Sequence, residues 1–115
     1  MTNTILVMVT CGYAKEAKRI ARRLVDARLA ACVNISAAPV QSIYRWKGKV
    51  ETAKEILLLV KTTRKRFSAL EREIRRLHSY DTPEIIALPI VGGSHAYLQW
   101  IAESVRPTGR GDNDK

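Results

Sequence analysis

The chain has 115 residues, of which 46% are hydrophobic, and a formal net charge of +9 at pH 7. This length and composition fit one globular domain with a buried core, and they exclude a disordered chain. The two cysteines, Cys11 and Cys32, form no CxxC pair, which excludes a zinc-finger framework and a disulfide scaffold and favours a reduced, cytoplasmic compartment.

The first half of the chain contains strand-like segments on both sides of one helix. Residues 4–11 are almost continuously apolar and rich in β-branched side chains, which predicts a strand buried on both faces; the run is too short for a signal peptide or a membrane span. From 14 to 30, apolar residues recur at helical spacing between basic ones, which predicts an amphipathic helix. Residues 31–37 and 40–46 are again strand-like.

A hairpin leads into the second half. Gly48 can adopt the positive φ that a tight reversal requires, and residues 55–62 are predicted as the returning strand. Apolar positions at steps of three and four predict a helix over 64–78, and a last strand follows at 85–90.

The end of the chain is predicted to hold one short helix and a free tail. Ser94 is suited to N-cap the helix, which continues through Ile101. The tail at 106–115 has no apolar residue to anchor it, so we expect it to be disordered. One domain is therefore predicted over 1–105.

The order β-α-β-β-α-β predicts an α+β, ferredoxin-like fold, with a four-stranded antiparallel sheet and both long helices on one face. The strands at 4–11 and 55–62 do not alternate apolar with polar residues, so apolar side chains are expected on the uncovered face as well. A soluble monomer rarely exposes such a surface, and we expect other copies of the chain to bury it.

The positive charge is concentrated on the two predicted helices. These helices either present solvated faces or bind a polyanion through non-specific attraction. RNA-recognition modules of this topology stack bases on aromatic residues of the central strands, but 4–11 and 55–62 contain none. The sequence therefore predicts no sequence-specific nucleic-acid partner.

Residues 75–86, RRLHSYDTPEII, place a histidine, carboxylates and a tyrosine between a helix and a strand. His78 closes the helix, either as a cap on its carbonyl end or as a metal ligand. Cys11 ends the first strand, where we expect it to be exposed, whereas Cys32 is expected in the core. Glu84 follows the turn and can supply a carboxylate or accept from free amides.

A thiolate, an imidazole and a carboxylate together suit copper or zinc, although their spacing does not show that they meet. His95 is expected to be solvated. The sequence contains no nucleophile-elbow, phosphate-loop or zinc-protease motif, so nothing in it predicts an enzyme.

Several blocks, in order along the chain, resemble the CutA family of divalent-cation tolerance proteins. They are VTC at 9–11, RLAACVNI at 28–35, SIYRWKGKVE at 42–51, LLLVKTT at 57–63, HSYDTPEIIALPI at 78–90 and YLQWI at 97–101. The resemblance implies a ferredoxin-like subunit, a homotrimer whose sheets pack around a threefold axis, and a cytosolic protein associated with tolerance of copper and other divalent metals.

The resemblance also implies functional residues. Copper-binding members are ascribed a cysteine at the end of the first strand and a His-His pair at the end of the second helix, which correspond to Cys11, Leu77 and His78 here. The first hypothesis is therefore metal binding by Cys11 and His78, with Glu84 as a third ligand. The family is also similar to trimeric signalling proteins that bind small effectors between subunits.

On that analogy an inter-subunit cleft is expected beside Trp46, Lys61, Tyr80, Glu84, Tyr97 and Trp100. The alternative for its aromatic residues is packing at a subunit interface. The second hypothesis is therefore an effector-binding signalling protein. A third is a stable assembly that docks to another protein.

Overall fold

The computed structural model describes residues 2–107, so positions 108–115 of the predicted tail lie outside the described part of the chain. The elements follow the predicted order. Their bounds are β1 Thr4–Cys11, α1 Ala14–Asp26, β2 Cys32–Ile35, β3 Val40–Trp46, β4 Lys49–Thr63, the 3₁₀ helix η1 Arg64–Arg66, α2 Phe67–Leu77, β5 Ile85–Pro89 and α3 His95–Ser104.

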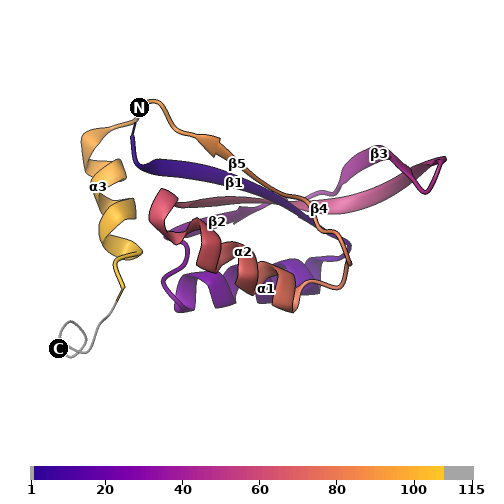
Figure 1. Cartoon of the computed structure of the whole chain (residues 1–115), viewed down its shortest axis with the longest axis horizontal. Helices are drawn as coiled ribbons and strands as arrows, with labels where there is room; N and C mark the ends of the chain where they lie inside the picture. Colours follow the sequence, from indigo (N-terminus) through magenta and orange to yellow (C-terminus); the bar gives the residue numbers. More distant parts are fainter. Residues whose placement is uncertain (1, 108–115) are drawn as a thin grey trace.

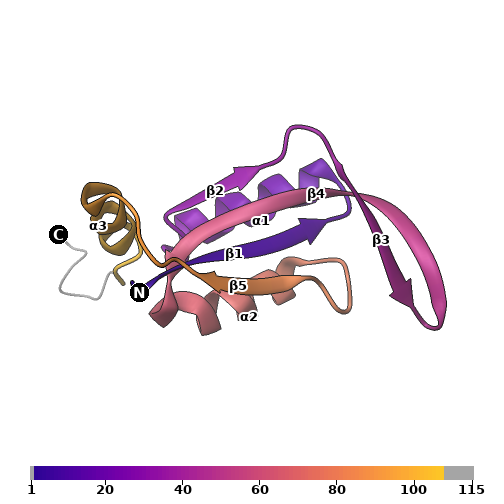
Figure 2. The same cartoon turned by 90° about the horizontal axis from the view of Figure 1, so that it is seen from above.

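The strands form one antiparallel sheet in the order β2-β4-β1-β5, with β3 paired to β4 away from this path. α1 and α2 both lie on one side of this sheet (Figure 1). Seen from above, the sheet lies in front of both helices, and its opposite face is open (Figure 2). The predicted ferredoxin-like arrangement is confirmed.

The sheet has five strands where the sequence predicted four, because the segments at 31–37 and 40–46 form two separate strands, β2 and β3, that pair with different parts of a β4 longer than expected. Lys47 and Gly48 both have positive φ, 50° and 82°, as a two-residue type I′ turn requires. The reversal is therefore immediate, and Trp46 pairs directly with Lys49. β3 and the first part of β4 form an arm, residues 40–54, that projects beyond the helices (Figure 1).

α1 ends earlier than predicted because the chain reverses at Arg28, which has a φ of 60°. The N–H of Leu29 donates to the Leu24 carbonyl at 2.9 Å, and the N–H of Arg28 donates to Val25 at 3.1 Å. This is the Schellman pattern, in which a left-handed residue closes the last turn of a helix.

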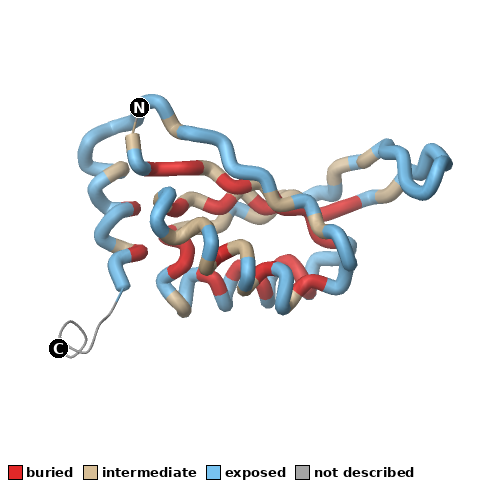
Figure 3. The backbone as a smooth tube through the Cα atoms, viewed as in Figure 1, coloured by how far each residue is buried: buried red, intermediate tan, exposed pale blue. Residues whose placement is uncertain are grey.

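The core lies between the sheet and the two helices (Figure 3). Alternate residues of β1 face the helices and are fully or almost fully buried: Ile5, Val7, Val9 and Cys11. The other face of the sheet also carries apolar side chains that are half-buried or exposed, namely Leu6, Met8, Leu57, Leu59, Ile86 and Leu88. We call these six residues the open face, and the predicted two-sided apolar sheet is confirmed.

α3 packs against the end of the sheet through a small cluster of Ala31, Ile101 and Val105. The predicted N-cap is confirmed, since the Ser94 hydroxyl accepts from the Tyr97 N–H at 3.2 Å. Among residues 2–107, no helix is both long enough and apolar enough to cross a membrane.

Candidate functional site

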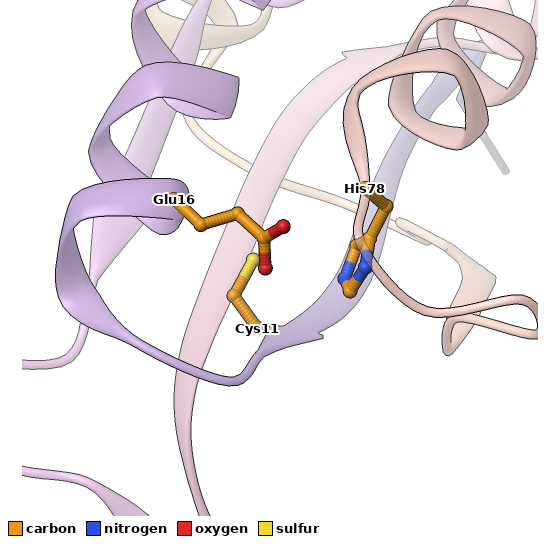
Figure 4. A group of neighbouring side chains, drawn as sticks. All are labelled: Cys11, Glu16 and His78. Carbon is orange, nitrogen blue, oxygen red and sulfur yellow. The ribbon is translucent and has the colours of Figure 1, made fainter.

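Three side chains with metal-binding atoms meet between β1, α1 and the end of α2. Cys11 ends β1, Glu16 lies in the first turn of α1, and His78 directly follows α2. The sulfur, a carboxylate oxygen and an imidazole nitrogen all lie within 4.8 Å of one another. Figure 4 shows the three side chains and the elements from which they come. We call these residues the buried cluster, because each of them is buried.

Cys11 is fully buried, so the expectation that it is exposed is wrong. It occupies the strand phase that faces the helices, and it pairs across the sheet with Ile56. Burial, followed by the nearby charges of Glu16 and Glu55, raises the pKa of the Cys11 thiol to about 12. The thiol is therefore protonated at neutral pH, and it becomes a metal ligand only after losing that proton.

Glu16 is the member of the buried cluster that our sequence analysis missed. Its side chain has no exposed surface, and its Oε2 accepts a hydrogen bond from the Ser79 N–H at 2.8 Å. In the part of the chain that the structure describes, no group donates a hydrogen bond to its Oε1. A signal was present in the sequence, because Glu16 lies one helical turn before Ile20 and thus on the apolar stripe of α1.

His78 is 8% exposed, and both of its ring nitrogens are engaged. Nδ1 accepts from the Tyr80 N–H at 3.1 Å, and Nε2 lies 2.8 Å from the Thr10 carbonyl. A nitrogen that accepts a hydrogen bond carries no proton, so Nε2 is assigned as the protonated nitrogen that donates to Thr10. His78 is the C-cap residue of α2, as predicted, but its ring reaches β1.

Glu84 and Leu77, two positions that the sequence analysis singled out, supply no atom to the buried cluster. Glu84 is exposed and lines an open hollow at the base of the arm, with Trp46 and Tyr80. Leu77 is partly buried and packs against the core. The carboxylate that lies beside Cys11 and His78 is therefore that of Glu16.

A carboxylate network closes the bottom of this hollow. Glu55 accepts from the Ser42 hydroxyl at 2.7 Å and from the Tyr80 hydroxyl at 3.0 Å. Burial and the Glu55 charge raise the pKa of Tyr80 to about 12. A Cβ at Gly12 would lie 3.1 Å from the Tyr80 hydroxyl oxygen, so glycine at position 12 leaves room for this tyrosine.

The remaining residues predicted beside a cleft lie elsewhere on the subunit. Lys61 donates to the Asn34 side chain on the sheet face away from the helices, and Cys32 is half-buried beside it. The prediction that Cys32 belongs to the core is therefore wrong. Tyr97 and Trp100 stack on α3, with ring centroids 5.4 Å apart.

The exposure of His95 is confirmed, and it lies in the first turn of α3.

The buried cluster fits a divalent metal ion in one respect above all, the unpartnered Oε1 of Glu16. A buried carboxylate oxygen without a donor is costly, and a bound cation would compensate for it. Sulfur, nitrogen and oxygen donors together match copper and zinc.

Known proteins of one family match this chain over most of its length. The sequence profile of the CutA1 divalent ion tolerance proteins matches residues 5–104. The divalent-cation tolerance protein CutA of Thermus thermophilus is 48% identical over 99 residues, which are 86% of this chain and 95% of that protein. The chloroplastic protein CutA of Arabidopsis thaliana is 43% identical over 90% of this chain, but the chain spans only 56% of that relative's length.

Solved structures agree with the sequence comparisons. The periplasmic divalent cation tolerance protein CutA of Archaeoglobus fulgidus superposes with a TM-score of 0.86 at 42% identity, covering 90% of this chain and 99% of that one. The structure from Thermus thermophilus gives a TM-score of 0.86 at 46% identity, over 88% of this chain and 97% of that one.

Proposed function

This chain belongs to the family of CutA1 divalent ion tolerance proteins, and from that premise we propose that it is a homotrimeric, non-enzymatic protein that binds copper or another divalent cation. The observation that carries this proposal is the meeting of three ligand-type side chains within 4.8 Å. Cys11 and His78 are the two ligands that also follow from the sequence, whereas Glu84, the third ligand that the sequence predicts, lies outside the buried cluster.

Metal binding by the buried cluster requires two local changes. The Cys11 thiol releases its proton, and the Nδ1 lone pair of His78 leaves the Tyr80 N–H. When bound, the ion supplies a positive charge beside the buried Glu16 carboxylate. Within the protein, Ser79 orients that carboxylate through its N–H, and Thr10 orients the imidazole through its carbonyl.

The test is a calorimetric titration with Zn(II) and, under anaerobic conditions, with Cu(I), because Cu(II) oxidises thiols. We expect saturable binding that Cys11→Ser and His78→Gln abolish or weaken at least ~10-fold. Cys32→Ser is the matched control, since it removes the other thiol, on the opposite sheet face, and leaves the buried cluster intact. Unchanged affinity in Cys11→Ser would overturn the ligand assignment.

The open face supports the homotrimer. Ile86 is 51% and Leu88 is 42% exposed in the single chain, and both lie beside Leu6 and Met8 of the neighbouring strand. Burial of this surface between copies of the chain would remove it from water. Sedimentation equilibrium is expected to give three times the mass of one chain, and a monomer at micromolar concentration would refute the assembly.

We place the protein in the cytoplasm. Both cysteines are free thiols, as in a reducing compartment. Relatives are named as chloroplastic and periplasmic, so the compartment is tested directly by cell fractionation with an antibody against this chain. Recovery in a periplasmic or organellar fraction would contradict the assignment.

The hollow at the base of the arm favours a second function, the binding of a small effector. Trp46, Tyr80 and Glu84 line it together with the buried Glu55. Among residues 2–107, no lysine or arginine lines it, so a cationic effector would match its charge. Quenching of tryptophan fluorescence by added amines, lost in Trp46→Phe and retained in Trp100→Phe, would support this function over metal binding alone.

A further inference from the structure

We infer that Glu16, rather than Glu84, is the third protein ligand of the metal site formed by Cys11 and His78. This inference rests on the proposed function, since it completes the same site. It assigns a direct metal-binding role to a residue that the sequence shows only as one acidic charge on a basic helix.

The two carboxylate oxygens of Glu16 differ in their hydrogen bonding. Oε2 of Glu16 accepts from the Ser79 N–H at 2.8 Å, which explains why this oxygen is buried. Oε1 is buried, and none of the described residues gives it a hydrogen bond. Buried polar atoms are almost always partnered, and a carboxylate oxygen can be partnered by a proton donor or by a cation.

The Glu16 side chain is also oriented toward the other two members of the buried cluster. The Glu16 side chain reaches from the first turn of α1 into the space between Cys11 and His78, and its carboxylate group points toward both of them (Figure 4). The ligand atoms of the three residues come from three separate elements but lie within 4.8 Å of one another. An ion between them would be in reach of all three with side-chain adjustments only.

The N-terminal end of α1 also favours a carboxylate at position 16. Glu16 lies in the first turn of α1, where the positive end of the helix dipole favours a carboxylate. The N-cap residue, Tyr13, makes no capping hydrogen bond with its side chain. The carboxylate is therefore held in place by the Ser79 N–H and by the helix end, and Oε1 remains free to bind.

Glu84 lacks each of these features. It is exposed, it lines the hollow at the base of the arm, and it does not belong to the group of ligand atoms around Cys11. It can therefore serve as a matched control, because Glu84→Gln makes the same chemical change at an exposed position.

The mixed donor set also selects the class of metal. Thiolate, imidazole and carboxylate ligands together suit a borderline divalent ion such as Zn(II), whereas Cu(I) prefers soft sulfur donors. Removal of the Glu16 carboxylate is therefore expected to weaken the binding of Zn(II) more than the binding of Cu(I).

The experiment measures Zn(II) affinity by competition with a chromophoric chelator, in the wild type, Glu16→Gln, Glu84→Gln and Cys11→Ser. Glutamine keeps an oxygen that can accept from Ser79, removes the charge and puts an NH2 group, which cannot bind a metal ion, in place of the other oxygen. We expect Glu16→Gln to weaken Zn(II) binding at least ~10-fold and Glu84→Gln to change it less than ~3-fold. The ligand-field absorption of bound Co(II) should change in Glu16→Gln and should stay as in the wild type in Glu84→Gln.

The outcomes separate the two levels of the proposal. If Cys11→Ser loses Zn(II) and Glu16→Gln does not, the role of Glu16 is overturned and the metal site stands. If neither variant changes the affinity, the site itself is overturned. Should Glu16→Gln fail to fold, a wild-type crystal soaked with Zn(II) decides: an anomalous peak in bonding contact with a Glu16 oxygen supports the inference, and a peak away from it refutes the inference.

Discussion

His78→Phe is expected to destabilise the metal-free protein by about 1–4 kcal/mol, because it removes two hydrogen bonds and keeps a buried ring. β5 pairs with β1 only as far as Val9, so the Thr10 carbonyl has no β5 partner and accepts from His78 Nε2 at 2.8 Å. A buried carbonyl left without a donor costs ~1–3 kcal/mol. The Tyr80 N–H, which donates to Nδ1 at 3.1 Å, adds less because this hydrogen bond is only partly buried.

Urea unfolding in the presence of a chelator measures this change, provided that all variants are compared at one protein concentration, because assembly contributes to stability. His95→Phe is the matched control, since His95 is exposed on α3 and its replacement should stay within about 0.5 kcal/mol of the wild type. If His78→Phe also stays within that range, His78 does not hold β1 to the loop that follows α2, and the reasoning fails.

Three further predictions concern charge and assembly. The folded-state pKa of Cys11 is raised from 9.0 to about 12, so the unfolded chain loses this proton first, and the free energy of unfolding should fall between those pH values by up to ~4 kcal/mol. Alkaline urea titrations should show a smaller fall in Cys11→Ala. Glu73 pairs with Arg23 and Arg76 at 2.7 Å, which lowers its pKa from 4.5 to about 2. Because both arginines are largely exposed, Glu73→Gln should lower the free energy of unfolding by less than ~1 kcal/mol at neutral pH and low salt. High salt should remove this difference in stability between variant and wild type, and so should acidification from pH 4.5 to 2, which protonates Glu73 in the wild type. Ile86→Lys places a charge on the open face and should shift the sedimentation mass toward one chain; an unchanged trimer would contradict the proposed interface.

Hydrophobic periodicity predicted the strands and helices that form the core, but it did not predict the arm. Residues 49–54, KVETAK, are mostly polar and exposed, so no buried face marks them as a strand. They are held by pairing with β3, and that pairing follows from the positive φ of Lys47 as well as of Gly48. The reversal itself was predicted from Gly48, but lysine at the first turn position does not indicate a two-residue turn as asparagine, aspartate or glycine would, so the start of the returning strand was placed too late.

The candidate site shows the same limit at the level of single residues. Glu84 was chosen because it is near His78 along the chain, whereas Glu16 is near it only in space. Cys11 was expected to be exposed because it ends a strand, but the phase of β1 turns it toward the helices. The sequence therefore predicted two of the three members of the buried cluster, Cys11 and His78, from their places at the ends of a strand and a helix, and the third required the packing of α1 against β1.

The two faces of the sheet differ in the kind of partner that they could contact. The basic side chains of α1 and α2 lie on the helical side of the sheet, while the open face is apolar. Glu16 is buried, so the exposed side of α1 is more basic than its sequence indicates. Exposed basic residues also lie on the arm, at Arg45, Lys47, Lys49 and Lys54, so the positive charge is not confined to the helices. The central strands β1 and β4 contain no aromatic residue on which a base could stack.

The energetics of the buried cluster decide how tightly it can bind a metal at neutral pH. With a pKa of about 12, removing the Cys11 proton at pH 7 costs ~7 kcal/mol, and the lost hydrogen bond from Tyr80 to His78 adds ~1 kcal/mol. Structural zinc sites with four ligands have binding free energies of ~10–16 kcal/mol. After the two costs above are subtracted, a site with three ligands keeps a net binding free energy of only a few kcal/mol. Binding should therefore be weak at pH 7 and tighten by ~10-fold with each unit of pH, since one proton is released. Zn(II) titrations at pH 6 and pH 8 test this, and equal affinities at the two values would show that the Cys11 thiol is not a ligand.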